Sequence, residues 1–181
     1  MDLERPLITK RLVLRKLSPD DVSEEYVAWL NDPDINQYLE SRFARHSSDT
    51  VRGFVQAMAA SDVDLLFGIF LAEDDRHIGN IRLGPIDPPH RRAAIGLLIG
   101  DTGCWGKGYA SEAIDAVAGY ALGTLDLHKV FAGYYAANAG SGKAFVKAGF
   151  KEESRAVRHC RYKNTWQDAV TVTRFNPKPD S

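Results

Sequence analysis

A glycine-rich turn near the middle of the chain has the residue types best suited to a chemical task. It reads Gly106-Lys107-Gly108-Tyr109-Ala110 and lies between an apolar alternating run that ends at Ile99 and a helical pattern that begins at Ala110. Small residues let the backbone curl so that several N–H groups converge, and the positive end of the helix dipole adds to their field. The turn therefore predicts a site for a phosphate group, and with it a phosphorylated cofactor.

Two widespread phosphate-binding motifs do not fit the chain. The dinucleotide fingerprint G-x-G-x-x-G requires a glycine three positions after Gly108, where the chain has Ser111. The nucleotide loop G-x-x-x-x-G-K-[S/T] fails around Lys143, because Ala137 stands at its first glycine and Ala144 at its hydroxyl position. Both mismatches argue against a nucleotide site of either kind.

The elements that must position this turn alternate between strand and helix patterns. Gly84-Pro85 is expected to interrupt regular structure before the fourth strand. The tail at 176–181 is expected to be flexible. We therefore predict one α/β (α+β) domain over 1–175, with a mixed, mostly antiparallel sheet of about seven strands flanked by helices. Strands are predicted over 9–15, 65–71, 77–83, 92–99, 128–136, 150–161 and 166–175, and helices over 18–30, 48–58, 110–122 and 138–148.

Bulk composition limits the classes of function that the chain can have. Its 181 residues are 44% hydrophobic and 26% charged, which is the balance of one soluble globular domain. A net charge of −1 argues against nucleic-acid binding as the main task. No apolar run approaches the roughly 20 residues that span a bilayer, so we expect a cytoplasmic protein without a membrane partner. Cys104 and Cys160 lack metal-ligand spacing, and no metal is predicted.

The turn resembles the acetyl-coenzyme A motif of the GNAT acetyltransferases, [Q/R]-x-x-G-x-[G/A]. The stretch 105–110 matches its fourth and sixth positions, whereas Trp105 replaces the glutamine or arginine. A Trp-Gly-Lys-Gly-Tyr-Ala-Ser-Glu-Ala string is similar to the branch that contains the ribosomal-protein N-terminal acetyltransferases and their amino-sugar and polyamine relatives. Residues 11–15, 138–141 and 145–150 also resemble this branch, so the resemblance covers nearly the whole chain.

The resemblance implies a fold and a reaction. The fourth and fifth strands, which end at Ile99 and Ala136, would separate from each other and expose backbone groups to the pantetheine arm. An amine would attack the thioester of acetyl-coenzyme A directly, without an acyl-enzyme. The implied cofactor-binding residues are Leu98, Ile99, Gly100, Trp105, Gly106, Lys107, Gly108, Tyr109, Ala110, Ser111, Asn138, Ser141 and Phe145.

Candidate catalytic residues also come from the resemblance. Ser141 matches a serine near the coenzyme thiol that can protonate the departing sulfur, and Asn138 matches beside it, although its position equally suits a helix cap. Glu153 matches a proposed base, with Glu152 adjacent. The tyrosine acid of many other GNAT enzymes falls at Phe145, so that acid is missing. Neutralising an amine of pKa near 8 costs about 1.4 kcal/mol at pH 7, so a modest carboxylate that acts through water suffices for an α-amine or a sugar amine.

The acceptor side is less specific in the sequence. A polar segment at 37–46 either lines a substrate mouth or forms a solvated loop. The predicted substrate-binding residues are Glu40, Arg42, Asn80 and His90.

Resemblance of 27–33, 38–43 and 79–81 to particular relatives favours an amino sugar or a sugar nucleotide as acceptor. A protein N-terminus is the alternative acceptor. The hypothesis from another class of function is a coenzyme A-binding module without catalysis. Several relatives are dimers, so a homodimer is compatible with the resemblance.

Overall fold

An eight-stranded sheet forms the centre of the protein in a computed structural model that describes residues 5–178. Its strand order is β1-β2-β3-β4-β5-β6-β8-β7, and every neighbouring pair is antiparallel except β5 and β6. This confirms the predicted mixed, mostly antiparallel sheet, with the two-residue β1 as an additional strand. The strands are β1 (Leu7–Ile8), β2 (Leu12–Lys16), β3 (Leu65–Leu71), β4 (His77–Asp87), β5 (Arg92–Ile99), β6 (Lys129–Tyr135), β7 (Lys151–Tyr162) and β8 (Thr165–Phe175).

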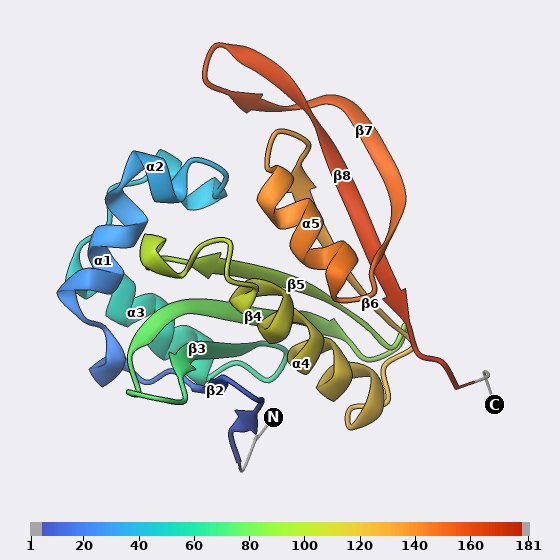
Figure 1. The fold of residues 1–181 in the computed structure, drawn as a ribbon, viewed down its shortest axis with the longest axis horizontal. Coiled ribbons are helices and arrows are strands. Elements are labelled where there is room, and N and C mark those ends of the chain that lie inside the picture. The colour runs from blue at the N-terminus through green and yellow to red at the C-terminus, as the bar shows by residue number, and fades with distance from the viewer. Residues whose placement is uncertain (1–4, 179–181) are drawn as a thin grey trace.

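Helices cover both faces of the sheet (Figure 1). Buried residues of α4 and α5 pack with one face, and buried residues of α1 and α3 pack with the other. Residues 179–181 of the tail predicted over 176–181 lie outside the described residues. The helices are α1 (Glu24–Asn31), α2 (Pro33–Asn36), α3 (Ser48–Ala59), α4 (Tyr109–Gly123) and α5 (Ala139–Lys147), with short 3-10 turns η1 (Pro19–Asp21), η2 (Glu40–Phe43) and η3 (Thr102–Cys104).

Two local predictions were wrong. The helix expected from Ser18 is only the turn η1, because Val22 leaves the helical region to bury its side chain against α1 and α3, and α1 begins anew after the Ser23 cap. The break expected at Gly84-Pro85 is instead an irregularity inside β4, which keeps pairing with β5 as far as Asp87. In both places long-range packing overrides a local signal.

The separation of the fourth and fifth predicted strands is confirmed. Strands β5 and β6 pair only where Arg92–Ala94 lie beside Lys129–Phe131. Beyond that point β5 continues on β4 and β6 continues on β8, so the two strands part towards Ile99 and Tyr135. The sheet therefore has a closed end and an open end between β5 and β6.

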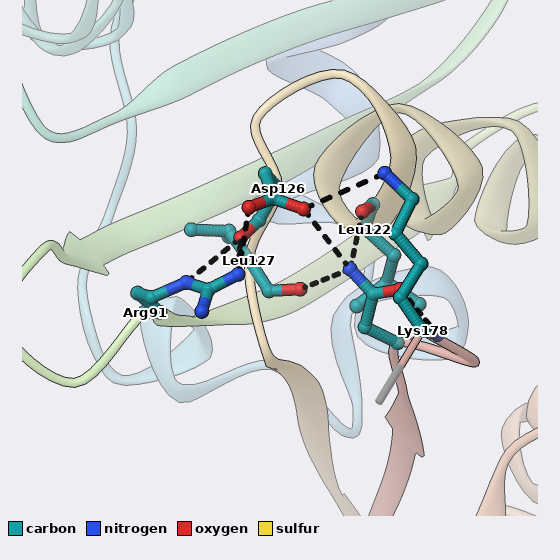
Figure 2. Close-up of polar contacts among 6 residues, drawn as sticks. Arg91, Leu122, Asp126, Leu127 and Lys178 are labelled. Carbon is teal, nitrogen blue, oxygen red and sulfur yellow. Dashed lines mark hydrogen bonds and ion pairs between the residues drawn. The ribbon is translucent and has the colours of Figure 1, made fainter. Parts of the chain in front are cut away.

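Polar contacts hold the closed end together (Figure 2). Arg91, in the turn before β5, donates to the carbonyl and the carboxylate of Asp126, each at 2.7 Å. The amide of Asn176 donates to the carbonyl of Leu122 at the end of α4, at 2.8 Å, and Lys178 lies 3.7 Å from Asp126. Residues 176–178, placed by the sequence in a flexible tail, thus contact the domain.

Candidate active site

The glycine turn leaves the N-terminus of α4 open. Gly108 is the residue before the helix and has φ +84°, and Gly106 has φ +73°, a region that disfavours side chains. The helices α1, α3 and α5 begin with side chains that accept from their first turns, namely Ser23, Ser47 and Asn138. Glycine has no side chain for this task, so the first N–H groups of α4 remain available to a ligand.

Arg11, which precedes β2, supports the turn from behind. Its Nη1 donates to the carbonyl of Lys107 at 2.9 Å, its Nε donates to Glu112 at 2.7 Å, and its guanidinium lies 4.4 Å from the centre of the Tyr109 ring. Thr9 also donates to Glu112, at 2.6 Å. Burial would raise the pKa of Glu112, but hydrogen bonds from Thr9 and Arg11 hold it below its usual value. The ionised Glu112 carboxylate therefore holds the Arg11 guanidinium in contact with the turn.

Cationic groups flank the open helix end. A Cβ built on Gly108 would lie 3.4 Å from Nζ of Lys147 and 3.5 Å from Nη2 of Arg11. Lys143 lies one helical turn before Lys147 on α5, and both line the same cavity as Gly108. Positive charges and converging N–H groups at one point fit a diphosphate.

A cavity of about 650 Å³ begins at this turn, passes between the open ends of β5 and β6, and ends beside α2. Its walls change in character along the way, from glycine and lysine at one end to aromatic and polar side chains at the other. The lining residues used below are Asp34, Gln37, Tyr38, Leu98, Ile99, Trp105, Gly106, Gly108, Tyr109, Ala110, Ser111, Tyr134, Tyr135, Asn138, Ser141, Lys143, Phe145 and Lys147.

The start of α5 lies in the middle of this cavity. The Asn138 side chain accepts from the backbone N–H of Ser141 at 3.1 Å, so Asn138 both caps α5 and lines the cavity. A Cβ on Gly142 would come within 2.9 Å of the Tyr134 hydroxyl, and glycine there lets the helix lie directly on the Tyr134 ring. Phe145 stacks on the same ring, with 6.5 Å between centroids. These contacts place Ser141 where β5 and β6 separate.

The far end of the cavity is lined by α2, residues 37–39 and the end of β6, and η2 contacts it through Tyr135. The Tyr135 hydroxyl donates to Glu40 and accepts from Arg42 at 3.0 Å. The Tyr38 ring stacks on Tyr162 of β7, with 5.0 Å between centroids. Burial and the hydrogen bond to Glu40 raise the pKa of Tyr135 to about 12, and burial and the Tyr162 phenol raise the pKa of Tyr38 to about 12. Both phenols are therefore protonated at neutral pH.

Residues 11–151 match the family model of the acetyltransferase (GNAT) domain. The chain belongs to the GNAT acetyltransferase family. It is 36% identical over 123 residues to the probable N-acetyltransferase YjcK of Bacillus subtilis (strain 168), covering 67% of each chain. It is 31% identical over 152 residues to the N-acetyltransferase p20 of Bacillus licheniformis, covering 81% of this chain and 83% of p20.

Solved structures share the fold. A GNAT-family acetyltransferase from Bacillus anthracis superposes with a TM-score of 0.82 at 22% identity, covering 96% of this chain and 99% of that one. The spermidine N-acetyltransferase of Vibrio cholerae, solved with CoA and spermine, also superposes with a TM-score of 0.82. It is 23% identical, and the match covers 93% of this chain and 97% of that one. The family match and the relatives at 36% and 31% identity thus make the protein an acetyl-CoA-dependent N-acetyltransferase.

Most of the cofactor residues named from the sequence line the cavity. Two of them do not line the cavity. Gly100 lies against Trp29, whose ring would be 2.0 Å from an added Cβ, and Lys107 contributes its carbonyl to Arg11. The Trp105 indole donates to the carbonyl of Ile99 at 2.8 Å and ties the turn to the end of β5.

Three other predicted residues lie away from the cavity. Glu153 pairs with Lys129 at the closed end of β5 and β6, so its position does not support a role as base. His90 lies in the turn before β5, at the end opposite Ile99, and not at the mouth of the separated strands. Asn80 is buried on the face that α1 and α3 cover, 2.9 Å from Nε2 of His77. Glu40 and Arg42 reach the cavity through Tyr135.

Several lining residues had no place in the sequence prediction. Lys143 and Lys147 lie four positions apart on a predicted helix, and that spacing was the available signal for a cationic side of α5. Tyr135 closes a predicted strand, and Tyr38 belongs to the polar segment. Within 5–178 no helix has the length and apolar character to cross a membrane, and no group of three or more potential metal ligands occurs there.

Proposed function

We propose that this enzyme transfers the acetyl group of acetyl-coenzyme A to the primary amine of an amino sugar or a sugar nucleotide. One observation carries the proposal: a single cavity joins a cationic, glycine-lined end to an aromatic, polar end through the gap between β5 and β6. A cosubstrate with a diphosphate suits the first end, and a small hydroxylated acceptor suits the second. The reacting atoms then meet at the open strand ends.

The cosubstrate end can be assigned residue by residue. The N–H groups from Gly108 to Ser111 hold the diphosphate, and Lys143 and Lys147 complement its charge. Acetyl-coenzyme A supplies an activated thioester. The acceptor nitrogen forms a bond to the acetyl carbon and the carbon–sulfur bond breaks. The Ser141 hydroxyl gives a proton to the departing sulfur and takes up the proton that the nitrogen loses as the amide forms. Asn138 fixes the first turn that carries Ser141.

The acceptor end favours a sugar over a polyamine. Tyr38 and Tyr135 present ring surface for stacking, and Gln37 presents an amide that can bond to hydroxyls. Among the described residues that line the cavity, Asp34 is the one carboxylate. A polyamine carries several ammonium groups, which need several carboxylates, whereas an amino sugar carries one.

Contacts above the acceptor end favour a small molecule over a polypeptide. Tyr162 of β7 donates to Gln37 at 2.6 Å, and Arg42 donates to the carbonyl of Arg161 at 2.8 Å. These two bonds join the hairpin of β7 and β8 to the segment around α2 and η2. This bridge restricts the space that an extended protein N-terminus needs. The alternative deserves a test, since a putative ribosomal-protein-serine acetyltransferase from Vibrio cholerae has the same fold, with a TM-score of 0.74 at 21% identity.

The test is to incubate the enzyme with acetyl-coenzyme A and four classes of amine, and to follow release of the free thiol. The classes are amino sugars, amino-sugar nucleotides, spermidine and short peptides with free N-termini. We expect the highest kcat/KM within the first two classes, by at least about tenfold. A peptide or spermidine as the best acceptor would overturn the sugar assignment and leave acetyl transfer intact. Absence of thiol release with every amine would overturn the whole proposal.

A further inference from the structure

Three side chains meet at the acceptor end of the cavity although they are far apart in the sequence. Tyr135 ends β6, whereas Glu40 and Arg42 belong to η2. The Tyr135 residue is 7% exposed, and the Arg42 side chain is 14% exposed. The Glu40 side chain, which accepts from the Tyr135 hydroxyl, is 74% exposed. A buried phenol thus connects the cavity with a carboxylate that reaches solvent.

The Tyr135 hydroxyl has one lone pair that its hydrogen bonds to Glu40 and Arg42 do not use. A phenol has one donor and accepts through two lone pairs. Its proton is donated to Glu40, and one lone pair accepts from Nη2 of Arg42 at 3.0 Å. Because Tyr135 lines the cavity, the second lone pair is suited to accept from an N–H group of a bound amine.

We propose that Tyr135 and Glu40 form a proton relay that removes the proton from the acceptor amine. This inference rests on the proposed acetyl transfer. The ammonium group gives a proton to the Tyr135 oxygen while the phenol gives its own proton to Glu40, so that the phenol is unchanged and the carboxylate becomes protonated. The neutral nitrogen then attacks the acetyl carbon, and Glu40 returns the proton to solvent.

Arg42 positions the relay. Its Nη1 donates to the carbonyl of Leu39 at 2.6 Å, and its Nη2 donates to Arg161 as well as to Tyr135, so the guanidinium is held from both sides. Its positive charge near the open lone pair disfavours the ammonium form of an amine placed there. Arg42 therefore lowers the cost of deprotonation at the point where the relay begins.

The electrostatic surroundings of the Tyr135 hydroxyl agree with a relay and argue against a phenolate base. Burial and Glu40 raise the pKa of Tyr135 to about 12, so the hydroxyl keeps a proton to pass on at neutral pH. The Glu40 carboxylate, which accepts the hydrogen bond of the Tyr135 hydroxyl, is then the final proton acceptor. The charged and titratable groups on the elements around this hydroxyl are Asp34 on α2, Tyr38 after it, Glu40 and Arg42 on η2, and Tyr162 on β7.

The same contacts also attach η2 to β6, so the experiment must separate a relay from a clamp. We compare Glu40→Gln, Tyr135→Phe and the double variant with the wild type, using the amine of the panel that the wild type acetylates fastest. Tyr120→Phe on α4 and Glu73→Gln in the turn after β3 are the matched controls, since neither residue lines the cavity. The measured quantity is kcat/KM from about pH 6 to about pH 10.

A relay predicts a loss that depends on pH. At pH 7 each single variant should lose about 100-fold in kcat/KM, because general base catalysis contributes at least that much. The loss should shrink below about tenfold at the highest pH, where the free amine is already neutral. The double variant should lose little more than either single one, since both residues act on one proton path. The controls should follow the wild type.

A clamp predicts a different pattern, and it would overturn the relay. Displacement of η2 lowers kcat/KM by the same factor at every pH, and a loss in coenzyme A affinity or thermal stability accompanies it. Wild-type rates in Tyr135→Phe would overturn the relay as well. In both cases the wild type still acetylates the amine, so the proposed function stands. If the wild type acetylates no amine of the panel, the proposed function and the relay both fail.

Discussion

Replacing Gly108 by alanine tests the assignment of the open helix end directly. Two effects combine in Gly108→Ala. A residue with a Cβ pays about 1–2 kcal/mol for the left-handed conformation that Gly108 holds at φ +84°. The new methyl group also stands 3.4 Å from Nζ of Lys147 and 3.5 Å from Nη2 of Arg11, in the space assigned to the diphosphate.

A second glycine of the turn separates these two effects. Gly106 has φ +73°, and within the described chain nothing lies within 4 Å of a Cβ built on it, so Gly106→Ala carries the strain alone. If the turn keeps its shape, the strain lowers the free energy of unfolding; if the turn relaxes, the strain weakens binding. The two losses should add up to about 1–2 kcal/mol, which is about 5- to 30-fold if it falls entirely on Kd.

Calorimetric titration with coenzyme A and urea unfolding measure the two quantities. We expect Gly108→Ala to weaken coenzyme A binding by at least about tenfold more than Gly106→Ala does, because only the former adds a methyl group beside the cations. The control is Gly119→Ala inside α4, where the described residues leave the Cβ open space; it should gain up to about 1 kcal/mol of stability and keep its affinity. Equal affinities of Gly106→Ala and Gly108→Ala would refute the placement of the diphosphate.

Three further predictions follow from single contacts. Ser141→Ala should lower kcat by about 100-fold and leave the Kd of coenzyme A unchanged in titration, since the hydroxyl acts on the departing sulfur. The pKa of Glu112 is held below its unfolded value, so its contribution to stability is present above about pH 4.5 and is lost as the pH falls further; Glu112→Gln should flatten the acid limb of a stability-against-pH curve. Asn176→Ala removes bonds of 2.8 and 3.1 Å to the carbonyls of Leu122 and Leu127, and should cost about 1–2 kcal/mol in urea unfolding with normal coenzyme A binding.

The parts of the site predicted from the sequence are those built by residues close together in the chain. The turn and the start of α4 need small residues within a few positions of each other, and Asn138 caps Ser141 three residues later. Such contacts leave a pattern in a single window of sequence. The alternation of apolar residues that ends at Ile99 likewise predicted the strand before the turn, and its predicted bounds are those of β5.

The acceptor end could not be predicted in this way, because its contacts join distant segments. Tyr135 meets Glu40 across 95 positions, and Tyr162 meets Gln37 across 125. The residue pattern of one segment carries no information about which distant segment it contacts. The prediction named Glu40 and Arg42 from the polar character of their segment, and it could not name the tyrosine through which they reach the cavity. The same limit applies to Glu153, whose partner Lys129 lies on β6.

The two ends of the cavity differ in the charge of the residues that line them. Lys143 and Lys147 line the cavity on the side of α4, whereas Asp34 lines it at the α2 end. An ammonium ion is repelled from the first end, and a diphosphate is repelled from the second. In the proposed relay the amine loses its charge at Tyr135 before it attacks, and Arg42 donates to that same hydroxyl. In the proposed reaction each substrate is therefore bound as an ion at its own end, and the neutral nitrogen meets the thioester at the strand gap.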